Sequence, residues 1–270
     1  NVGTMSNSGV EVDLNYRDHR GDFSWNIAVN ATYTNNVLTE LGDDATSLYG
    51  SSHKIGQLTR GVVGLPFPYY YGYKTDGVFQ NWDEVRAYTN AEGKLIQPDA
   101  QPGDFRYQDL NGDGSITAEG DRTNLGKCVP SWTYGINAGI DWKGIDFSMV
   151  WQGVAGNKIF DGTRRTDIPT MNQPKYVLNR WTGEGSTNEY PRFTVTDPNQ
   201  NWSKASDFFI KDASYFRLKN VTLGYTLPVK WTNKIFVKKL RVYVACENAL
   251  TFTKYDGFDP EIADYVDRGI

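Results

Sequence analysis

Hydrophobic and polar residues alternate along three parts of this chain, and each part predicts a pair of antiparallel strands. In the segment 132–152, apolar side chains occupy every second position from Trp132 to Trp142 and again from Ile145 to Trp151. This period of two is that of a β-strand. With Lys143-Gly144 as a two-residue turn, Trp142 faces Ile145 and all the apolar residues share one face. The other face carries polar residues: Thr133, Asn137, Asp141, Asp146, Ser148 and Gln152.

The same alternation occurs before and after this hairpin. Residues 10–16 and 23–33 predict a first hairpin whose turn covers residues 17–22. Residues 215–227 and 240–253 predict a third hairpin. Its apolar residues change parity near Lys219-Asn220, which predicts a β-bulge at that point.

The connections between these strands alternate between short and long. Residues 34–131 and 153–214 are the long ones. Tight turns on one side and long loops on the other are typical of a transmembrane β-barrel, whereas a soluble sandwich mixes loop lengths at both ends. We therefore predict an all-β chain that forms antiparallel strands of a transmembrane barrel with long extracellular loops. A soluble, calcium-stabilised β-sandwich that binds carbohydrate is the alternative.

Composition and charge narrow the possible functions. Aromatic residues make up 14% of the chain and the net charge is −4, so no basic surface favours a nucleic-acid partner. No apolar run reaches the roughly 20 residues of a transmembrane helix. His19 and His53 are the only histidines, and no nucleophile or phosphate-binding motif accompanies them. The chain is therefore predicted not to be an enzyme.

One loop has the composition of a calcium site. Oxygen-bearing residues at loop positions 1, 3 and 5, with a glycine at position 6, match the first half of an EF-hand-type loop. Position 12, where an EF-hand loop has its closing carboxylate, is Gly120. Glu119 comes one residue before this position and Asp121 one residue after it, so a closing ligand at Asp121 requires a loop that is one residue longer. The predicted Ca²⁺ ligands are Asp109, Asn111, Asp113, Ser115 and Asp121. An Asx-rich turn without a metal is the alternative.

Aromatic residues are concentrated in the first long loop. Tyrosine and tryptophan combine a large contact area with a polar group, so they are candidates for binding a ligand or a partner. The candidates are Tyr69, Tyr70, Tyr71 and Trp82. For most of these rings, packing of the loop against its own surroundings is the stronger expectation.

Several longer motifs together resemble one known family. The segments 103–114, 121–123, 132–137, 214–228, 240–244, 248–252 and 257–261 are similar, in this order, to the C-terminal part of SusC/RagA TonB-dependent outer-membrane transporters. The last of these segments is Gly-Phe-Asp-Pro-Glu. In this family, the Asp-rich loop normally carries an acid at position 12, so the extra residue before Asp121 changes the expected geometry.

The resemblance implies that residues 1–270 are part of one β-barrel domain of roughly 22 strands, comprising later strands and extracellular loops. A plug domain and a closing strand are expected to be absent from this sequence. The implied function is TonB-dependent import of glycans or peptides across the outer membrane of a Gram-negative bacterium. The implied partners are a SusD-like lipoprotein, TonB through the missing N-terminal part, the oligosaccharide or peptide substrate and outer-membrane lipid.

Overall fold

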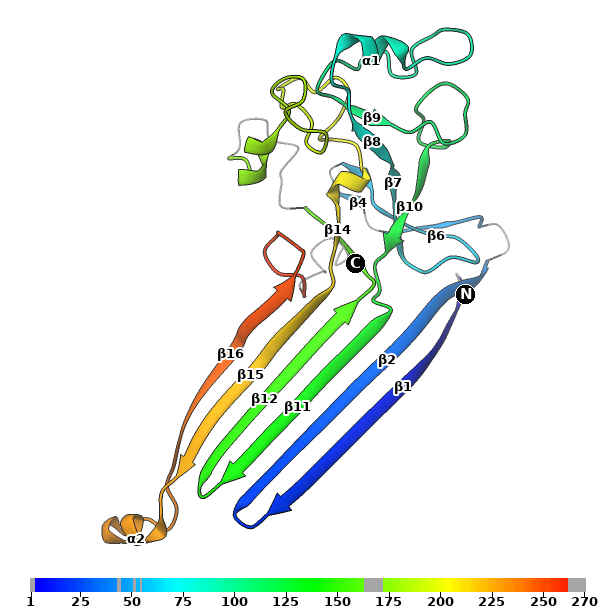
Figure 1. Cartoon of the computed structure of the whole chain (residues 1–270). Coiled ribbons are helices and arrows are strands. Elements are labelled where there is room, and N and C mark those ends of the chain that lie inside the picture. The colour runs from blue at the N-terminus through cyan, green and yellow to red at the C-terminus, as the bar shows by residue number, and fades with distance from the viewer. Residues whose placement is uncertain (1–2, 43–44, 51, 54, 163–171, 262–270) are drawn as a thin grey trace.

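The computed structural model describes residues 3–42, 45–50, 52–53, 55–162 and 172–261, and its largest unit is one six-stranded antiparallel sheet (Figure 1). Strands that are neighbours in the order given next are hydrogen-bonded to each other. In that order the strands are β1 (Gly3–Arg20), β2 (Phe23–Leu41), β11 (Trp132–Trp142), β12 (Ile145–Ala155), β15 (Tyr215–Thr226) and β16 (Arg241–Thr253). Within the described residues, β1 and β16 are the two edges, so the sheet does not close into a barrel.

The central hairpin has the predicted register. Trp142 pairs with Ile145, Ile140 with Phe147, and Ile136 with Trp151. Lys143 and Gly144 both have positive φ, 48° and 88°, as a tight two-residue hairpin turn requires. The alternation of apolar and polar residues therefore fixes which side chains share a face.

The first hairpin is longer than predicted. The predicted turn over residues 17–22 is wrong, because Arg17 to Arg20 continue β1 and pair with Asn26 to Phe23. Only Gly21 and Asp22 form the turn, and Gly21 has a φ of 61°. Polar residues extend these strands because their backbone groups complete the hydrogen-bonded ladder whatever their side chains are.

The predicted bulge is confirmed. Pairing shifts between Leu218 and Asn220 on both sides of β15, so Lys219 lies outside the regular ladder. On β16 the shift coincides with Asn248, which has a φ of 51°. The extra residue returns Phe216 and Leu218 to the apolar face, where Phe216 stacks on Trp151 with ring centroids 4.8 Å apart.

The two ends of the sheet differ strongly. One end carries the two-residue turns and the short connection with α2 (Val229–Thr232) and η3 (Asn233–Ile235). The other end carries the long segments between β2 and β11 and between β12 and β15 (Figure 1). These contain β3 (Leu48–Tyr49), β4 (Ser52–His53), β5 (Gly56–Gln57), β6 (Thr59–Gly61), β7 (Tyr69–Tyr73), β8 (Thr75–Val78), α1 (Trp82–Ala87), β9 (Phe105–Tyr107), β10 (Arg122–Lys127), β13 (Lys158–Phe160), η1 (Lys175–Asn179), η2 (Asp207–Phe209) and β14 (Ile210–Asp212).

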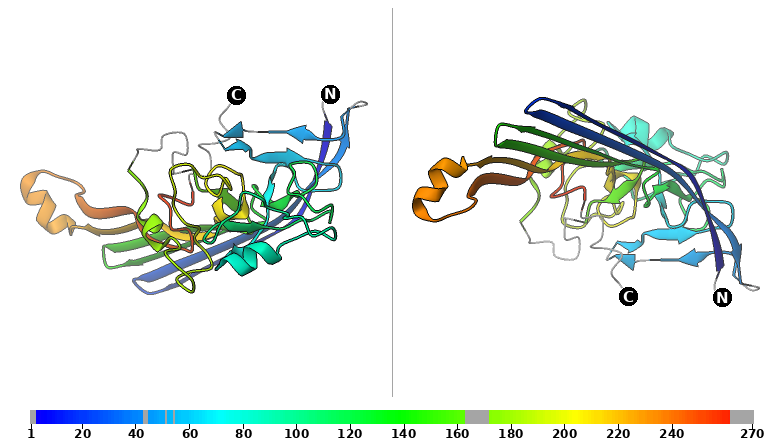
Figure 2. Two further views of the ribbon diagram at one scale, coloured as in Figure 1. Left: turned by 90° about the horizontal axis from the view of Figure 1, so that it is seen from above. Right: turned by 90° about the horizontal axis from the view of Figure 1, so that it is seen from below.

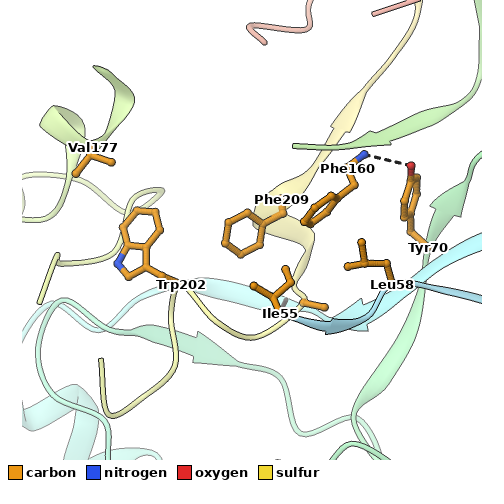
Figure 3. Close-up of a cluster of buried hydrophobic side chains, with 8 residues drawn as sticks. Ile55, Leu58, Tyr70, Phe160, Val177, Trp202 and Phe209 are labelled. Carbon is orange, nitrogen blue, oxygen red and sulfur yellow. Dashed lines mark hydrogen bonds between the residues drawn. The ribbon is translucent and has the colours of Figure 1, made fainter. Parts of the chain in front are cut away.

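The hydrophobic cores lie in these long segments and not between two sheets. In the main cluster, Leu58, Phe160 and Phe209 come from different parts of the two loops and pack together (Figure 3). The Tyr70 hydroxyl accepts a hydrogen bond from the Phe160 amide at 3.2 Å (Figure 3). Two smaller clusters surround Tyr107 and Phe79, which are fully buried. The loops therefore form a packed body at one end of the sheet.

The sheet has one apolar face and one polar face, as predicted. The apolar face is exposed over most of its length: Val10, Leu14, Leu223 and Val244 expose 66%, 65%, 56% and 74% of their surface. A single sheet with this face uncovered differs from the sandwich alternative, in which a second sheet would cover it. Among the described residues, no helix is long and apolar enough to cross a membrane.

Candidate functional site

The body of loops is held together by a buried polar network between the two long segments. Asp104, which has no exposed surface, accepts hydrogen bonds from Arg192 and from the amide of Asn201 at 2.8 Å. The side-chain oxygen of Asn201, Oδ1, accepts a hydrogen bond from the Phe105 backbone amide at 2.8 Å. Asn199 bonds to the Phe105 carbonyl at 3.0 Å. These bonds fix residues 104–105 against residues 192–201, although about ninety positions separate them in the sequence.

A second set of contacts between distant residues involves the half-buried Arg122 on β10. Its guanidinium lies 4.3 Å from the centre of the Tyr71 ring and donates to the Tyr71 carbonyl at 2.6 Å. It also donates to the carbonyl of Gln57. Burial lowers the pKa of Arg122, and Tyr71 and Tyr73 oppose that effect. A cation held over rings and carbonyls in this way fixes the first loop rigidly.

A cavity of about 630 Å³ opens between the second long segment and the residues after β16. Ligand pockets commonly have this size and combine aromatic rings with a few polar groups. Aromatic rings, amides and carboxylates all contribute to its wall. The lining residues are Asp161, Asn172, Gln173, Pro174, Lys175, Tyr176, Leu178, Asn179, Asp256, Gly257 and Phe258. The sequence analysis did not identify this cavity, because its two walls are about eighty residues apart in the chain.

This cavity combines neutral hydrogen-bonding groups with two carboxylates, Asp161 and Asp256, and one ammonium group, Lys175. Burial, followed by the charges of Asp161 and Asp256, raises the pKa of the neighbouring Tyr255 to about 12. The phenol is therefore a hydrogen-bond donor at neutral pH. Phe258 exposes 93% of its surface, so its ring is available for stacking. Hydroxyl or amide groups on an oligomer are suited to such a surface.

The Asp-rich loop forms the expected turn. The Asp109 carboxylate accepts from the amides of Gly112 at 2.7 Å and Gly114 at 2.8 Å. Both glycines have positive φ, 74° and 84°. The loop therefore folds around the first predicted ligand, with glycines where the backbone turns sharply.

The other predicted calcium ligands divide into two groups. Asp113 accepts from Asn111 at 2.7 Å and from the Ser115 hydroxyl at 2.9 Å, and these bonds lower the pKa of the Asp113 carboxyl. Asp121 is fully buried, and its two oxygens accept from the Leu110 and Thr117 amides, each at 2.7 Å. Among the described residues, no group of three or more His, Cys, Asp or Glu side chains is arranged to hold a metal ion. Calcium binding stays a prediction.

The aromatic candidates are mostly packed. Tyr69, Tyr70 and Tyr71 expose only 3%, 5% and 7% of their surface, as expected for rings that pack the loop against its own surroundings. They lie on β7, at the centre of the four-stranded sheet formed by β10, β7, β6 and β3, which buries them. Trp82 begins α1 and is half exposed. Of the four, it is the one whose position leaves a ligand or partner role open.

The polar face of the large sheet carries a charged cluster that the sequence analysis missed. Arg217, although only 6% exposed, donates to Asp259 at 2.6 Å and to Glu261 at 2.6 Å. Lys219, at the bulge, donates to Glu261 at 2.9 Å. The end of the Gly-Phe-Asp-Pro-Glu segment therefore folds back onto the polar face and positions Phe258 at the cavity. Cys128 and Cys246 are not joined by a disulfide bond.

Comparison with known proteins gives relatives along almost the whole chain. No family model matches the sequence. TonB-dependent receptor P3 of Formosa agariphila is 30% identical over 268 residues, which cover 97% of this chain and 26% of that protein. TonB-dependent receptor SusC of Bacteroides thetaiotaomicron is 26% identical, over 99% of this chain and 25% of its own length.

The fold also matches solved structures. The structure of the RagAB peptide transporter matches with a TM-score of 0.72 at 24% identity, covering 96% of this chain and 27% of that chain. The RagAB peptide importer in the "open-open" state matches with a TM-score of 0.69 at 22% identity, covering 96% and 26%. This chain spans about a quarter of the length of these proteins. The chain is thus related, over nearly its whole length, to a quarter-length part of the β-barrel of TonB-dependent receptors of the SusC and RagA type.

Proposed function

We propose that this chain is part of the wall and outer loops of a transporter that imports nutrient oligomers, glycans or peptides, across the outer membrane of a Gram-negative bacterium. TonB drives the import, and a SusD-like surface lipoprotein covers the loop end. The chain performs no bond chemistry. Its strands separate the lipid from a polar lumen, and its loops contact the substrate.

The observation that carries this proposal is the division of the sheet into two faces. All six strands carry exposed apolar side chains on one contiguous face. Soluble monomers rarely expose an apolar surface that extends over so many strands. The opposite face bears amides, hydroxyls and the charged pairs of Arg217 and Arg241. Lipid on one side and water on the other satisfy both faces.

The loop cavity supports a direct role in substrate binding. Its amide and carboxylate groups suit the hydroxyls of a glycan or the backbone of a peptide, and Phe258 offers a stacking surface. The packed loop body holds this cavity at the end opposite the tight turns. A lipoprotein partner on that end would enclose a substrate bound there.

Uptake by cells tests the proposal. The complete transporter is expressed in its own outer membrane, and entry of fluorescent oligopeptides and oligosaccharides is measured with and without an uncoupler of the proton-motive force. We expect saturable entry of one class of oligomer that the uncoupler abolishes, and co-purification of a lipoprotein with the tagged transporter. Entry that persists with the uncoupler, or without the transporter, would contradict the proposal.

A matched pair of variants tests whether the cavity binds the substrate. Phe258→Ala removes a fully exposed ring, so no packing is lost. Because an aromatic contact contributes about 0.5–1.5 kcal/mol, the half-saturation concentration should rise about 2- to 12-fold. Val195→Ala, at a residue 80% exposed and outside the cavity, should leave it unchanged. Equal effects of the two variants would exclude this cavity as a binding site.

We also propose that the Asp-rich loop binds Ca²⁺, which would stabilise the outer loops. Two observations support this: the oxygen ligands at positions 1, 3 and 5, and the turn around Asp109 with Gly112 and Gly114 in the left-handed region. The lowered pKa of Asp113 keeps its carboxylate ionised at neutral pH.

A further inference from the structure

The connection between β15 and β16 differs from the other two connections at its end of the sheet. Gly21-Asp22 and Lys143-Gly144 are the whole of the other turns, whereas residues 227–240 include α2 and η3. In Figures 1 and 2, α2 projects beyond the ends of the neighbouring strands, far from the loop body. A tight turn would join these strands as well, so the extra residues call for an explanation.

These extra residues combine apolar and polar side chains. Residues 229–232 are one turn of α-helix, residues 233–235 are a 3-10 turn, and Phe236 follows in the left-handed region. The apolar residues Val229, Trp231, Ile235 and Phe236 expose 56%, 61%, 60% and 99% of their surface. Thr232 alone among residues 229–236 is buried. The described part of the chain therefore leaves these four apolar side chains uncovered.

The segment is also strongly basic. Lys230, Lys234, Lys238 and Lys239 lie within ten residues, and no Asp or Glu occurs between positions 227 and 240. All four lysines are exposed. In a chain with a net charge of −4, this is a local concentration of positive charge. A surface that is both apolar and basic favours an anionic lipid interface over an uncharged one.

This segment is connected directly to the end of the sheet. Leu227 and Leu240, which flank it, form a backbone hydrogen bond of 2.9 Å. Next to them, Tyr225 and Val242 are exposed on the apolar face. Aromatic residues at this level of a barrel wall lie at the membrane surface. The helix therefore starts where the apolar band ends.

We propose that residues 229–239 are an interfacial anchor that binds anionic phospholipid in the periplasmic leaflet of the outer membrane. Trp231 and Phe236 insert among the acyl chains near the headgroups, and the four lysines bind the phosphates. This inference rests on the membrane placement given under the proposed function. It adds a lipid-binding site on the wall of the barrel, away from the substrate path.

Lipid quenching in a bilayer tests the anchor. The complete transporter, with Cys128→Ser and Cys246→Ser, carries a single bimane-labelled cysteine at Phe236→Cys, Asn233→Cys or Val244→Cys. It is reconstituted with phosphatidylglycerol or phosphatidylcholine that is brominated on the acyl chains. We expect strong quenching at position 236, weak quenching at position 233, and several-fold more quenching at 236 by brominated phosphatidylglycerol than by brominated phosphatidylcholine.

Val244 separates the two proposals, because it lies on the apolar face of the sheet. Quenching at 244 but not at 236 would overturn the anchor and leave the barrel intact, with the helix face covered by protein. Absence of quenching at both positions would overturn the membrane placement itself. Changing all four lysines to Gln should remove the preference for phosphatidylglycerol at 236 and leave the quenching at 244 unchanged. A preference that survives this change would also contradict the anchor.

Discussion

The guanidinium of Arg241 on β16 donates to both carboxylate oxygens of Asp146 on β12, although β15 runs between these two strands. The pair crosses β15 at Gly224, which is the direct register partner of Asp146. A Cβ atom at Gly224 would lie 2.6 Å from the Asp146 carboxylate. Glycine therefore leaves the space that lets an ion pair span three strands on the polar face.

Gly224→Ala tests this arrangement. In a strand interior, alanine is normally more stable than glycine by about 0.5–1 kcal/mol. Here the added methyl group displaces the ion pair, and the loss of that pair offsets the gain, so we expect that the unfolding temperature, measured by the heat-dependent mobility of the barrel on gels, does not rise. Gly183→Ala is the control, because nothing lies within 4 Å of its Cβ. An unfolding temperature that rises for Gly224→Ala would show that the pair contributes nothing.

The buried network of the loops should be sensitive to one carboxylate. Asp104→Ala leaves Arg192 and Asn201 without their acceptor, and removing one partner of a buried ion pair costs about 3–5 kcal/mol. We expect rapid proteolysis of the outer loops in this variant while the barrel stays folded. Asp76→Ala breaks a partly exposed pair with Arg106 and should cost about 0–1 kcal/mol. Equal protease resistance of the two variants would contradict a structural role for Asp104.

Asp207 gives the loops a predictable pH dependence. Its burial raises the pKa of its carboxyl, and hydrogen bonds from Thr75 oppose this only in part. A carboxyl with a raised folded pKa stabilises the protein fully below the unfolded value of about 3.9, and that contribution is lost as the pH rises through the folded pKa. Asp207→Asn should therefore gain loop stability relative to wild type between pH 4 and pH 7. A stability difference that is constant with pH would contradict the raised pKa.

Calcium binding is measured by isothermal titration of the complete transporter. We expect uptake of one Ca²⁺ for this loop, with Asp109→Asn and Asp113→Asn each weakening it at least about tenfold, since both remove a charged oxygen ligand. Glu92→Gln, at an exposed acid outside the loop, should bind Ca²⁺ like wild type. No Ca²⁺ uptake by the wild-type protein would leave the loop as an Asx-rich turn.

The sheet was largely predictable because its strand faces, turn and bulge depend on patterns among residues that are close together in the sequence. Alternation gave the faces, the Lys143-Gly144 turn gave the register, and the change of parity at Lys219 gave the bulge. The length of the first hairpin was not predictable from apolar residues, because backbone bonds alone extend it through Arg17 to Arg20. α1 also has a local signal, because the Asn81 side chain caps its first turn by accepting a hydrogen bond from the Glu84 amide.

The loop body was not predictable because its contacts are distant in sequence. Nothing near Asp104 indicates that its partners are Arg192 and Asn201. The burial of Tyr70 likewise depends on a strand 90 residues later. The cavity and the Arg217 cluster form only when the segment after β16 folds back onto the sheet. The Gly-Phe-Asp-Pro-Glu motif could be recognised in the sequence, but its contacts with Arg217 and its place at the cavity could not.

The most direct test of the central claim is the sidedness of the sheet in living cells. In the background lacking Cys128 and Cys246, Glu92→Cys in the loop body and Asp22→Cys in the first tight turn are exposed to a membrane-impermeant maleimide. We predict that Glu92→Cys is labelled in intact cells and that Asp22→Cys is labelled only after the outer membrane is permeabilised. Labelling of Asp22→Cys in intact cells, or equal labelling of both positions before permeabilisation, would contradict a sheet that spans the outer membrane with its loops outside.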